Sequence, residues 1–183
     1  MIYGEDACGK TTFVMKLVER SKLPATIVYT EDQSFLSKFN ISGMTLYTAS
    51  DFESQGNLLN WIFPPQDSIF VIDSISKNCA KALANGEDPA YLNRELFRQI
   101  ALVRSITKRR NLVSIVVNQI RVGEKDHTGT LFERPFGGEQ TMNFFDLVLR
   151  FSRHEKGLTK VDVEKGDLNI SNKVIKILDM SKL

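Results

Sequence analysis

The sequence predicts an α/β fold in which helices flank a mostly parallel central sheet and an antiparallel hairpin closes the chain. Short apolar, β-branched runs alternate with longer segments of helical periodicity, a glycine-containing loop joins the first strand to the first helix, and the C-terminal stretch alternates apolar with polar residues. Ligands of such sheets bind at the carboxyl ends of the strands. The polar residues that end each run are therefore the first candidates for function.

The chain opens with "MIYGEDACGKTTF", in which Gly4 to Thr11 reads G-x-x-x-x-G-K-T. This is the pattern of a phosphate-binding P-loop, whose glycines adopt positive φ so that backbone N–H groups surround an anion at a helix N-terminus. We expect Lys10 to reach the β- and γ-phosphates and the Thr11 hydroxyl to hold Mg²⁺. The predicted nucleotide-binding residues are Gly4, Glu5, Asp6, Ala7, Cys8, Gly9, Lys10, Thr11 and Thr12.

The flanks of this loop support the P-loop interpretation. "MIY" is a short apolar lead-in, and residues 10 to 21 place Phe13, Val14, Leu17 and Val18 at helical spacing. A P-loop follows a strand and opens a helix, so this context favours it over the alternative, a glycine turn with a chance lysine.

Length and composition limit the function classes. The 183 residues, 42% of them hydrophobic, suffice for one core, most simply a single domain over 1 to 183. A net charge of +2 is too small to imply a nucleic-acid partner by itself. Cys8 and Cys79 have neither metal-ligand nor disulfide spacing. Without a long apolar run or a signal sequence, we expect a soluble, cytoplasmic protein with no membrane partner.

The remaining elements follow in chain order. Proline and β-branched residues indicate a strand over 24 to 30, and short apolar runs indicate others, at 44 to 48, 68 to 73, 111 to 117 and 145 to 151. A helix is predicted over 51 to 63, with Asp51 as its N-cap.

A second long helix is predicted over 88 to 110. Asp88 is its expected N-cap and Pro89 its first residue, and an apolar stripe lies along one face, formed by Leu92, Leu96, Ile100 and Val103. The alternating tail, 158 to 178, turns at 166 to 167 and predicts an antiparallel hairpin.

Carboxylates end two of the predicted strands. Asp73 closes "SIFVID", where a P-loop requires a carboxylate that holds Mg²⁺ through its water shell; the alternative is a cap of the next turn. Glu31 closes "IVYT" and is the candidate base that orients and deprotonates an attacking water. Asp32 is open to the same role, and a solvated loop carboxylate is the alternative.

Two amides, Asn118 and Gln119, end the strand at 111 to 117. Each can hydrogen-bond a phosphate oxygen and a loop backbone, so an amide here could report the γ-phosphate to the loop behind it. Asn-Gln is also an ordinary strand terminator.

Residues 120 to 136 are predicted to form a loop longer than compact domains usually contain. The segment mixes cations with phenylalanines, the composition that binds single strands through phosphate contacts and base stacking. The candidate DNA-binding residues are Arg121, Lys125, Phe132 and Arg134. Acidic residues dilute the charge, and a disordered surface loop is the alternative.

In this order, the segments resemble the RecA/RadA family of recombinases, and the resemblance covers nearly the whole chain. It is carried by "IYGEDACGKTT", "IVYTEDQSF", "SIFVIDSIS", "IVVNQIRVG" and "PFGGEQTMNFFDLVLRF". Their order, and the pairing of "NQIR" with a following "GG", are more specific than any single motif.

The resemblance implies a RecA-like P-loop NTPase core, an ATPase of homologous recombination and DNA repair with ATP and Mg²⁺ as cofactors and single-stranded DNA as partner. It implies that Glu31 is the catalytic base, with Lys10 and Gln119 as further catalytic residues, Gln119 sensing the γ-phosphate. It also implies that 120 to 136 is the second DNA-binding loop, while the first would fall within 76 to 88.

Two departures from the family concern assembly. Family members carry an N-terminal segment that docks on a neighbouring subunit, whereas this sequence begins almost at the phosphate loop. Their ATP site is completed by cations of the next protomer, for which Lys173, Lys176 and Lys182 are the candidates here. A homo-oligomer and a partner recombinase both stay open.

Two other functions also stay open. One is an accessory recombinase paralogue that binds ATP, hydrolyses it weakly and regulates a partner recombinase. The other is a ring-forming helicase or clock-type ATPase of the same superfamily.

Overall fold

The computed structural model describes residues 1–125, 131–155, 158–166 and 176–179. Its strands are β1 (Ile2–Gly4), β2 (Ala25–Tyr29), β3 (Met44–Thr48), β4 (Ile69–Asp73), β5 (Val113–Lys125), β6 (Leu131–Pro135), β7 (Val148–Arg153), β8 (Leu158–Lys165) and β9 (Lys176–Asp179). Its α-helices are α1 (Lys10–Ser21), α2 (Phe52–Trp61), α3 (Lys77–Ala84) and α4 (Pro89–Arg110), and two 3₁₀ helices are η1 (Gln33–Lys38) and η2 (Glu139–Phe144).

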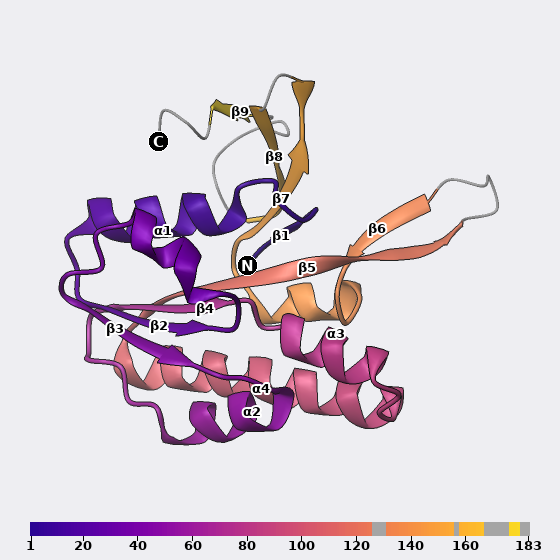
Figure 1. Ribbon diagram of the computed structural model, residues 1–183, viewed down its shortest axis with the longest axis horizontal. Helices are drawn as coiled ribbons and strands as arrows, with labels where there is room; N and C mark the ends of the chain where they lie inside the picture. The colour runs from indigo at the N-terminus through magenta and orange to yellow at the C-terminus, as the bar shows by residue number, and fades with distance from the viewer. Residues whose placement is uncertain (126–130, 156–157, 167–175, 180–183) are drawn as a thin grey trace.

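The described strands form one sheet in the order β3-β2-β4-β5-β1-β7-β8-β9. All neighbours from β3 to β7 are parallel, whereas the β7–β8 and β8–β9 pairs are antiparallel. Strand β6 pairs with β5 alone, and the two form a ribbon that extends beyond the sheet (Figure 1). The predicted α/β fold, a mostly parallel sheet with flanking helices and an antiparallel C-terminal hairpin, is confirmed.

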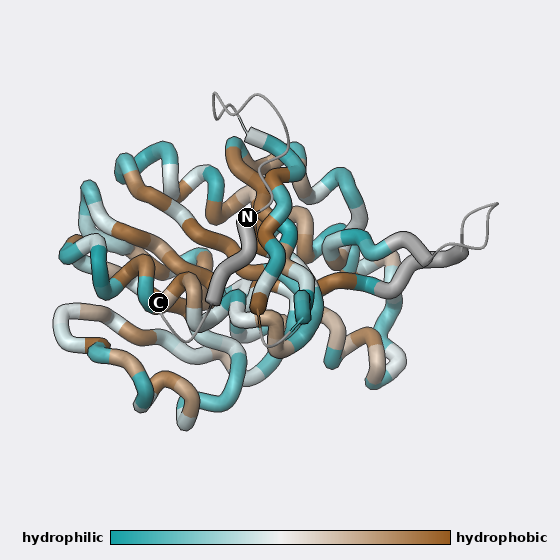
Figure 2. Tube along the Cα trace, turned by 90° about the horizontal axis from the view of Figure 1, so that it is seen from above, coloured by the Kyte–Doolittle hydropathy of each residue, from teal (hydrophilic) through white to brown (hydrophobic). Residues whose placement is uncertain are grey.

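Helix α1 covers one face of the sheet, and α2, α3 and α4 cover the other (Figure 1). Because side chains alternate along a strand, each central strand is buried on both faces. In β4, Phe70 and Ile72 pack into the α2–α4 core, whereas Ile69 and Val71 pack toward α1. Figure 2 shows the result, hydrophobic strands enclosed by more hydrophilic helices and loops.

The predicted helix N-termini are confirmed. The Asp51 carboxylate accepts a hydrogen bond of 2.7 Å from the Ser54 N–H, and the Ser54 hydroxyl accepts one of 3.2 Å from the Asp51 N–H, which is a capping box. Asp88 accepts from the N–H groups of Ala90 and Tyr91 at the start of α4.

Two segments differ from the sequence prediction. Residues 76 to 88, expected to contain a DNA-binding loop, contain helix α3, whose Asn78, Cys79 and Ala82 are buried. The expectation missed this helix because its eight residues carry only a short apolar stripe. Residues 120 to 136 are an antiparallel ribbon over their described part, because β5 continues past the sheet and β6 returns beside it.

Candidate nucleotide site

Strand parity brings the candidate side chains to one face of the sheet. Asp73 points to the same face of the sheet as Ile69 and Val71, which pack toward α1. By the same alternation, Gln119 points to the face of Ile115 and Val117. The phosphate loop precedes α1 on this same face. Loop, strand ends and α1 therefore enclose a pocket of about 490 Å³, within the usual range for small-molecule sites.

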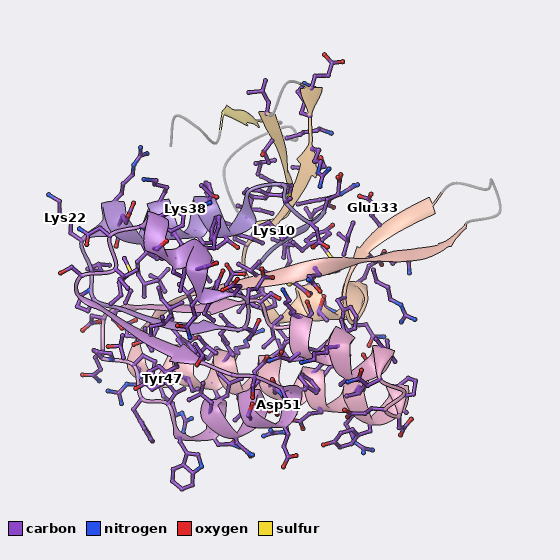
Figure 3. The ribbon with its side chains drawn as sticks, in the orientation of Figure 1. Lys10, Lys22, Lys38, Tyr47, Asp51 and Glu133 are labelled. Atoms are coloured by element: carbon purple, nitrogen blue, oxygen red, sulfur yellow. The ribbon has the colours of Figure 1, made fainter. Side chains whose placement is uncertain are left out.

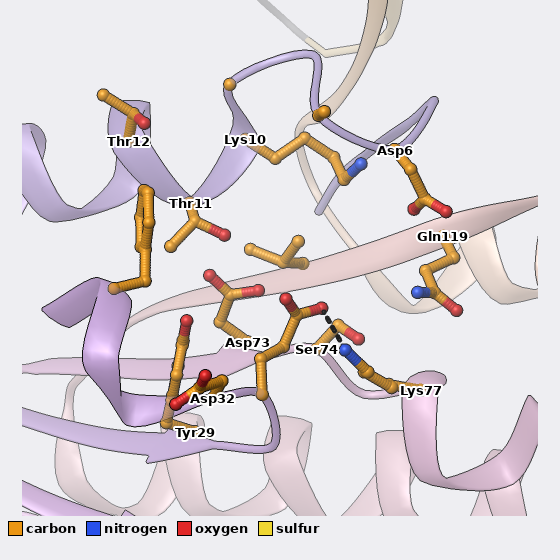
Figure 4. Close-up of a pocket in the computed structure, with 15 residues that line it drawn as sticks. Asp6, Lys10, Thr11, Thr12, Tyr29, Asp32, Asp73, Ser74, Lys77 and Gln119 are labelled. Atoms are coloured by element: carbon orange, nitrogen blue, oxygen red, sulfur yellow. Dashed lines mark ion pairs between the residues drawn. The ribbon is translucent and has the colours of Figure 1, made fainter. Parts of the chain in front are cut away.

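The pocket lining contains most of the sequence-predicted residues. From the phosphate loop and α1 come Asp6, Ala7, Gly9, Lys10, Thr11 and Thr12; from the strand ends and the segments after them come Tyr29, Glu31, Asp32, Phe35, Asp73, Ser74, Lys77, Val117 and Gln119. Gly4, Glu5 and Cys8, also predicted to bind nucleotide, do not line it. Figure 4 shows Lys10 and Thr11 on one side, with Asp73 and Lys77 facing them.

The phosphate loop has the backbone that its glycines predict. Gly9 lies in the left-handed region at φ 88° and is the N-cap residue of α1, and Ala7 also has a positive φ of 56°. Such alternation turns successive N–H groups toward one point, which is an anion-binding arrangement.

Gly4 is required for a second reason. A Cβ at this position would lie 1.9 Å from the Phe151 carbonyl oxygen, so β7 passes too close for any side chain. The loop is braced from the same direction, because Arg153 donates to the Asp6 carbonyl at 2.9 Å and Thr159 donates to the Cys8 carbonyl at 2.8 Å. Contacts from β7 and β8 therefore hold the phosphate loop in place.

Lys10, the first residue of α1 and labelled in Figure 3, is buried at 8% exposure. Its ammonium donates to the carbonyl oxygens of Gly4 at 2.8 Å and Glu5 at 2.5 Å. These bonds hold the cation against the phosphate loop, on the side of the pocket where the motif predicts the β- and γ-phosphates.

Asp73 and Thr11 form the candidate metal pair. Asp73 is 3% exposed; burial raises the pKa of its carboxyl to about 6, while a hydrogen bond with the Thr11 side chain acts in the opposite direction. Within the described ranges, no three His, Cys, Asp or Glu side chains form a metal-binding group. One buried carboxylate beside one hydroxyl fits Mg²⁺, which proteins usually bind through one or two carboxylates together with substrate phosphates.

The structure distinguishes the two acidic residues after β2. Asp32 is the N-cap of η1, where its carboxylate accepts a 2.9 Å hydrogen bond from the Ser34 N–H, and this bond lowers its pKa. Glu31 makes no such cap and its Oε1 lies 3.4 Å from the Lys77 ammonium, the ion pair drawn as a dashed line in Figure 4. This geometry favours Glu31 over Asp32 as the candidate base.

The two amides at the end of the part of β5 that pairs with β1 have different surroundings. Gln119 lines the pocket, and its backbone lies in register with Gly4 of the phosphate loop. Asn118 points to the opposite face, where it is fully buried and donates to the Phe136 carbonyl at 3.0 Å. Of the two amides, Gln119 is therefore the one that lines the candidate nucleotide pocket.

The backbone of Gln119 joins the pocket to the ribbon. Its N–H donates to the Ser76 hydroxyl at 3.1 Å, and its carbonyl accepts from the Phe136 N–H at 2.8 Å. Phe136 directly follows β6, so the backbone of one residue contacts both the segment after Asp73 and the base of the ribbon.

The candidate DNA-binding residues lie on this ribbon. Arg121 and Arg134 are direct cross-strand partners, both exposed, and Arg134 forms an ion pair with Glu139 at 3.4 Å. Glu133 instead pairs with Arg150 of β7 at 2.7 Å, and Figure 3 shows it beside the sheet. The structure describes the backbone of Lys125 and Phe132 but not their side chains, and residues 126–130 lie outside it.

Sequence reasoning missed five pocket residues, namely Tyr29, Phe35, Ser74, Lys77 and Val117. The signal for Tyr29 was available, since it precedes Glu31 by two residues and must share its face. Burial and the charge of Asp73 raise the pKa of Tyr29, so it presents a neutral hydroxyl to the pocket. Of the proposed trans-acting lysines, Lys173 and Lys182 lie outside the described residues, and Lys176 is described by its backbone alone.

The fold and the pocket define an α/β protein with a P-loop at the carboxyl edge of its sheet. The structure is similar to the crystal structure of the RadB recombinase, with a TM-score of 0.71 and 21% sequence identity over 96% of this chain and 84% of that chain. The likeness is one of fold: the chain has the fold of a RecA-type recombinase core. No protein-family model matches the sequence, and no curated protein sequence matches it.

Among the described helices, none is both long enough and apolar enough to span a membrane.

Proposed function

We propose that this protein is a Mg²⁺-dependent ATPase of DNA recombination and repair that binds single-stranded DNA on the β5–β6 ribbon. The observation that carries the proposal is Gln119, whose side chain lines the pocket while its backbone bonds the base of the ribbon. A nucleotide contact at this residue would act directly on a candidate DNA-binding element.

Several pocket residues would act together in hydrolysis. Lys10 and the loop N–H groups bind the phosphates, and Thr11 and Asp73 hold Mg²⁺, which neutralises phosphate charge when bound. Glu31 takes a proton from a water whose oxygen attacks the γ-phosphorus. The bond from that phosphorus to the β,γ-bridging oxygen breaks, and ADP and phosphate leave.

The test is ATP hydrolysis by the purified protein with Mg²⁺, with and without single-stranded DNA. Stimulation by DNA supports the proposal. Hydrolysis that DNA does not change would contradict the coupling through Gln119.

A specific observation favours one second candidate. The Glu31 carboxylate is engaged by Lys77 at 3.4 Å, and an engaged base suits an accessory paralogue that binds ATP, hydrolyses it weakly and regulates a partner recombinase. Tight ATP binding with slow, DNA-insensitive hydrolysis would support this function.

A further inference from the structure

Lys77 occupies a position that helix electrostatics alone disfavours. It is the first residue of α3, where the helix dipole presents partial positive charge, and cations are unfavourable there. The Ser76 side chain makes no capping bond to α3, and its hydroxyl accepts from the Gln119 N–H. An anion in front of Lys77 would offset this unfavourable placement.

The anions in front of Lys77 belong to the pocket. Its ammonium lies 3.4 Å from Glu31 Oε1, and the carboxylates of Asp73 and Asp32 line the same pocket. At 43% side-chain exposure, Lys77 reaches into the pocket without being locked in the core.

Lys10 and Lys77 approach the pocket from opposite sides. Lys10 is held at the phosphate loop by two carbonyl oxygens, whereas Lys77 extends from the α3 side toward Glu31 (Figure 4). Among the described lining residues these two are the cations, against four carboxylates, Asp6, Glu31, Asp32 and Asp73. Phosphoryl transfer needs positive charge around the transferred group, and Lys77 is the lining cation beside the candidate base.

We propose that Lys77 is a cis-acting cation of the ATP site: its ammonium holds Glu31 at the pocket, and it contacts the γ-phosphate when ATP binds. This inference rests on the proposed ATPase function and assigns the charge that binds the γ-phosphate opposite Lys10. In hydrolysis, the Lys77 ammonium keeps its protons and stabilises negative charge on the γ-phosphoryl oxygens, while the water proton goes to Glu31. A charge supplied from the same chain needs no neighbouring protomer.

The distinguishing measurement is equilibrium binding of two nucleotides that differ in the γ-phosphate. Isothermal titration with Mg²⁺ would compare ADP with a non-hydrolysable ATP analogue for wild type, Lys77→Met and Lys77→Arg. Lys81→Met is the matched control, because Lys81 is an exposed lysine one turn further along α3 and does not line the pocket.

Lys77→Met should weaken binding of the ATP analogue about tenfold or more, the loss expected for one charge-assisted contact, and leave ADP binding within about twofold. Lys77→Arg should retain most of the affinity, and Lys81→Met should resemble wild type. Retained ADP binding also shows that the variant is folded.

The other outcomes separate two failures. Suppose that wild type binds both nucleotides and that Lys77→Met weakens both to the same extent or leaves both unchanged. The assignment of Lys77 to the γ-phosphate is then wrong, while nucleotide binding by the protein stands. If wild type binds neither nucleotide, the proposed ATPase function itself fails.

Discussion

Arg121 and Arg134 lie directly opposite each other across the β5–β6 ribbon. Like charges in directly opposed positions destabilise an antiparallel pair, and Glu139 offsets the charge of Arg134 at 3.4 Å. A phosphate bound at this pair would interact favourably with both guanidinium groups.

Replacing either arginine with alanine should therefore weaken single-strand binding at every sequence. The log–log salt dependence should flatten by about 0.7 per lost phosphate contact, because fewer counterions are released. Fluorescence anisotropy of a labelled oligonucleotide across a salt series, with an ATP analogue present, measures both quantities. Arg109→Ala, an exposed arginine at the end of α4, is the control and should leave binding unchanged. Unaltered binding in both ribbon variants would place the DNA site elsewhere.

Phe132→Ala should give a different signature from the arginine variants. Loss of base stacking should cost about 1–3 kcal/mol of binding free energy, and the salt slope should stay nearly constant because stacking releases no counterions. The same anisotropy series measures it. A slope that falls together with the affinity would argue against a stacking role.

Lys10→Ala should abolish nucleotide binding or hydrolysis. No other cation of the phosphate loop motif can reach the β- and γ-phosphates, and Lys10 is held at the loop by the Gly4 and Glu5 carbonyls. Isothermal titration with an ATP analogue checks this outcome. Wild-type affinity together with wild-type turnover would remove the P-loop assignment.

Glu31→Gln should keep ATP bound and slow hydrolysis by about 10²-fold or more, because a lost general base usually costs that much. Asp32→Asn is the matched control, since Asp32 caps η1 through the Ser34 N–H. Single-turnover phosphate release, measured beside equilibrium binding, separates chemistry from affinity. Slow turnover in Asp32→Asn with normal turnover in Glu31→Gln would assign the base to Asp32.

Gly4→Ala should destabilise the protein by about 3 kcal/mol or more, because strained backbone and an overpacked contact cost about 1–3 kcal/mol each. The new Cβ would meet the Phe151 carbonyl, a backbone atom that cannot rotate away. Gly43→Ala is the control: its φ is +78° with nothing within 4 Å, so it should lose only about 1–2 kcal/mol from the left-handed backbone. Denaturant unfolding compares the two, and equal losses would contradict the collision.

The fold was largely predictable because the strong signals are local. Apolar runs gave β2, β3 and β4 nearly at their observed ends, and Asp51 and Asp88 marked their helices through caps that need only neighbouring residues. Helix α3 was not predicted, because its burial depends on tertiary contacts with α4. The ribbon was predicted as a loop, because Gly123 and the charged residues around it suppress the strand pattern of β5.

Some residues of the candidate site could be predicted from the sequence, and others could not. Lys10, Thr11 and Asp73 follow from a motif and a strand end, and the structure brings their side chains to one pocket. Lys77 carried no sequence signal, since its meeting with Glu31 depends on β2 and β4 being neighbours in the sheet.

The continuity of β5 has a mechanical consequence. Its 13 residues form one strand that runs from the hydrophobic core, past Gln119 at the pocket, to Lys125 on the ribbon, with a shift of register against β6 between Val122 and Lys125. At about 3.3 Å per residue, Lys125 lies about 20 Å beyond Gln119 along the strand. The inner half of β5 pairs with β4 and β1. The outer half has β6 as its strand partner among the described residues, so it projects from the point at the pocket where the sheet holds β5. A small rotation of the backbone at Gln119 would therefore displace Lys125 by a larger distance than it displaces Gln119 itself.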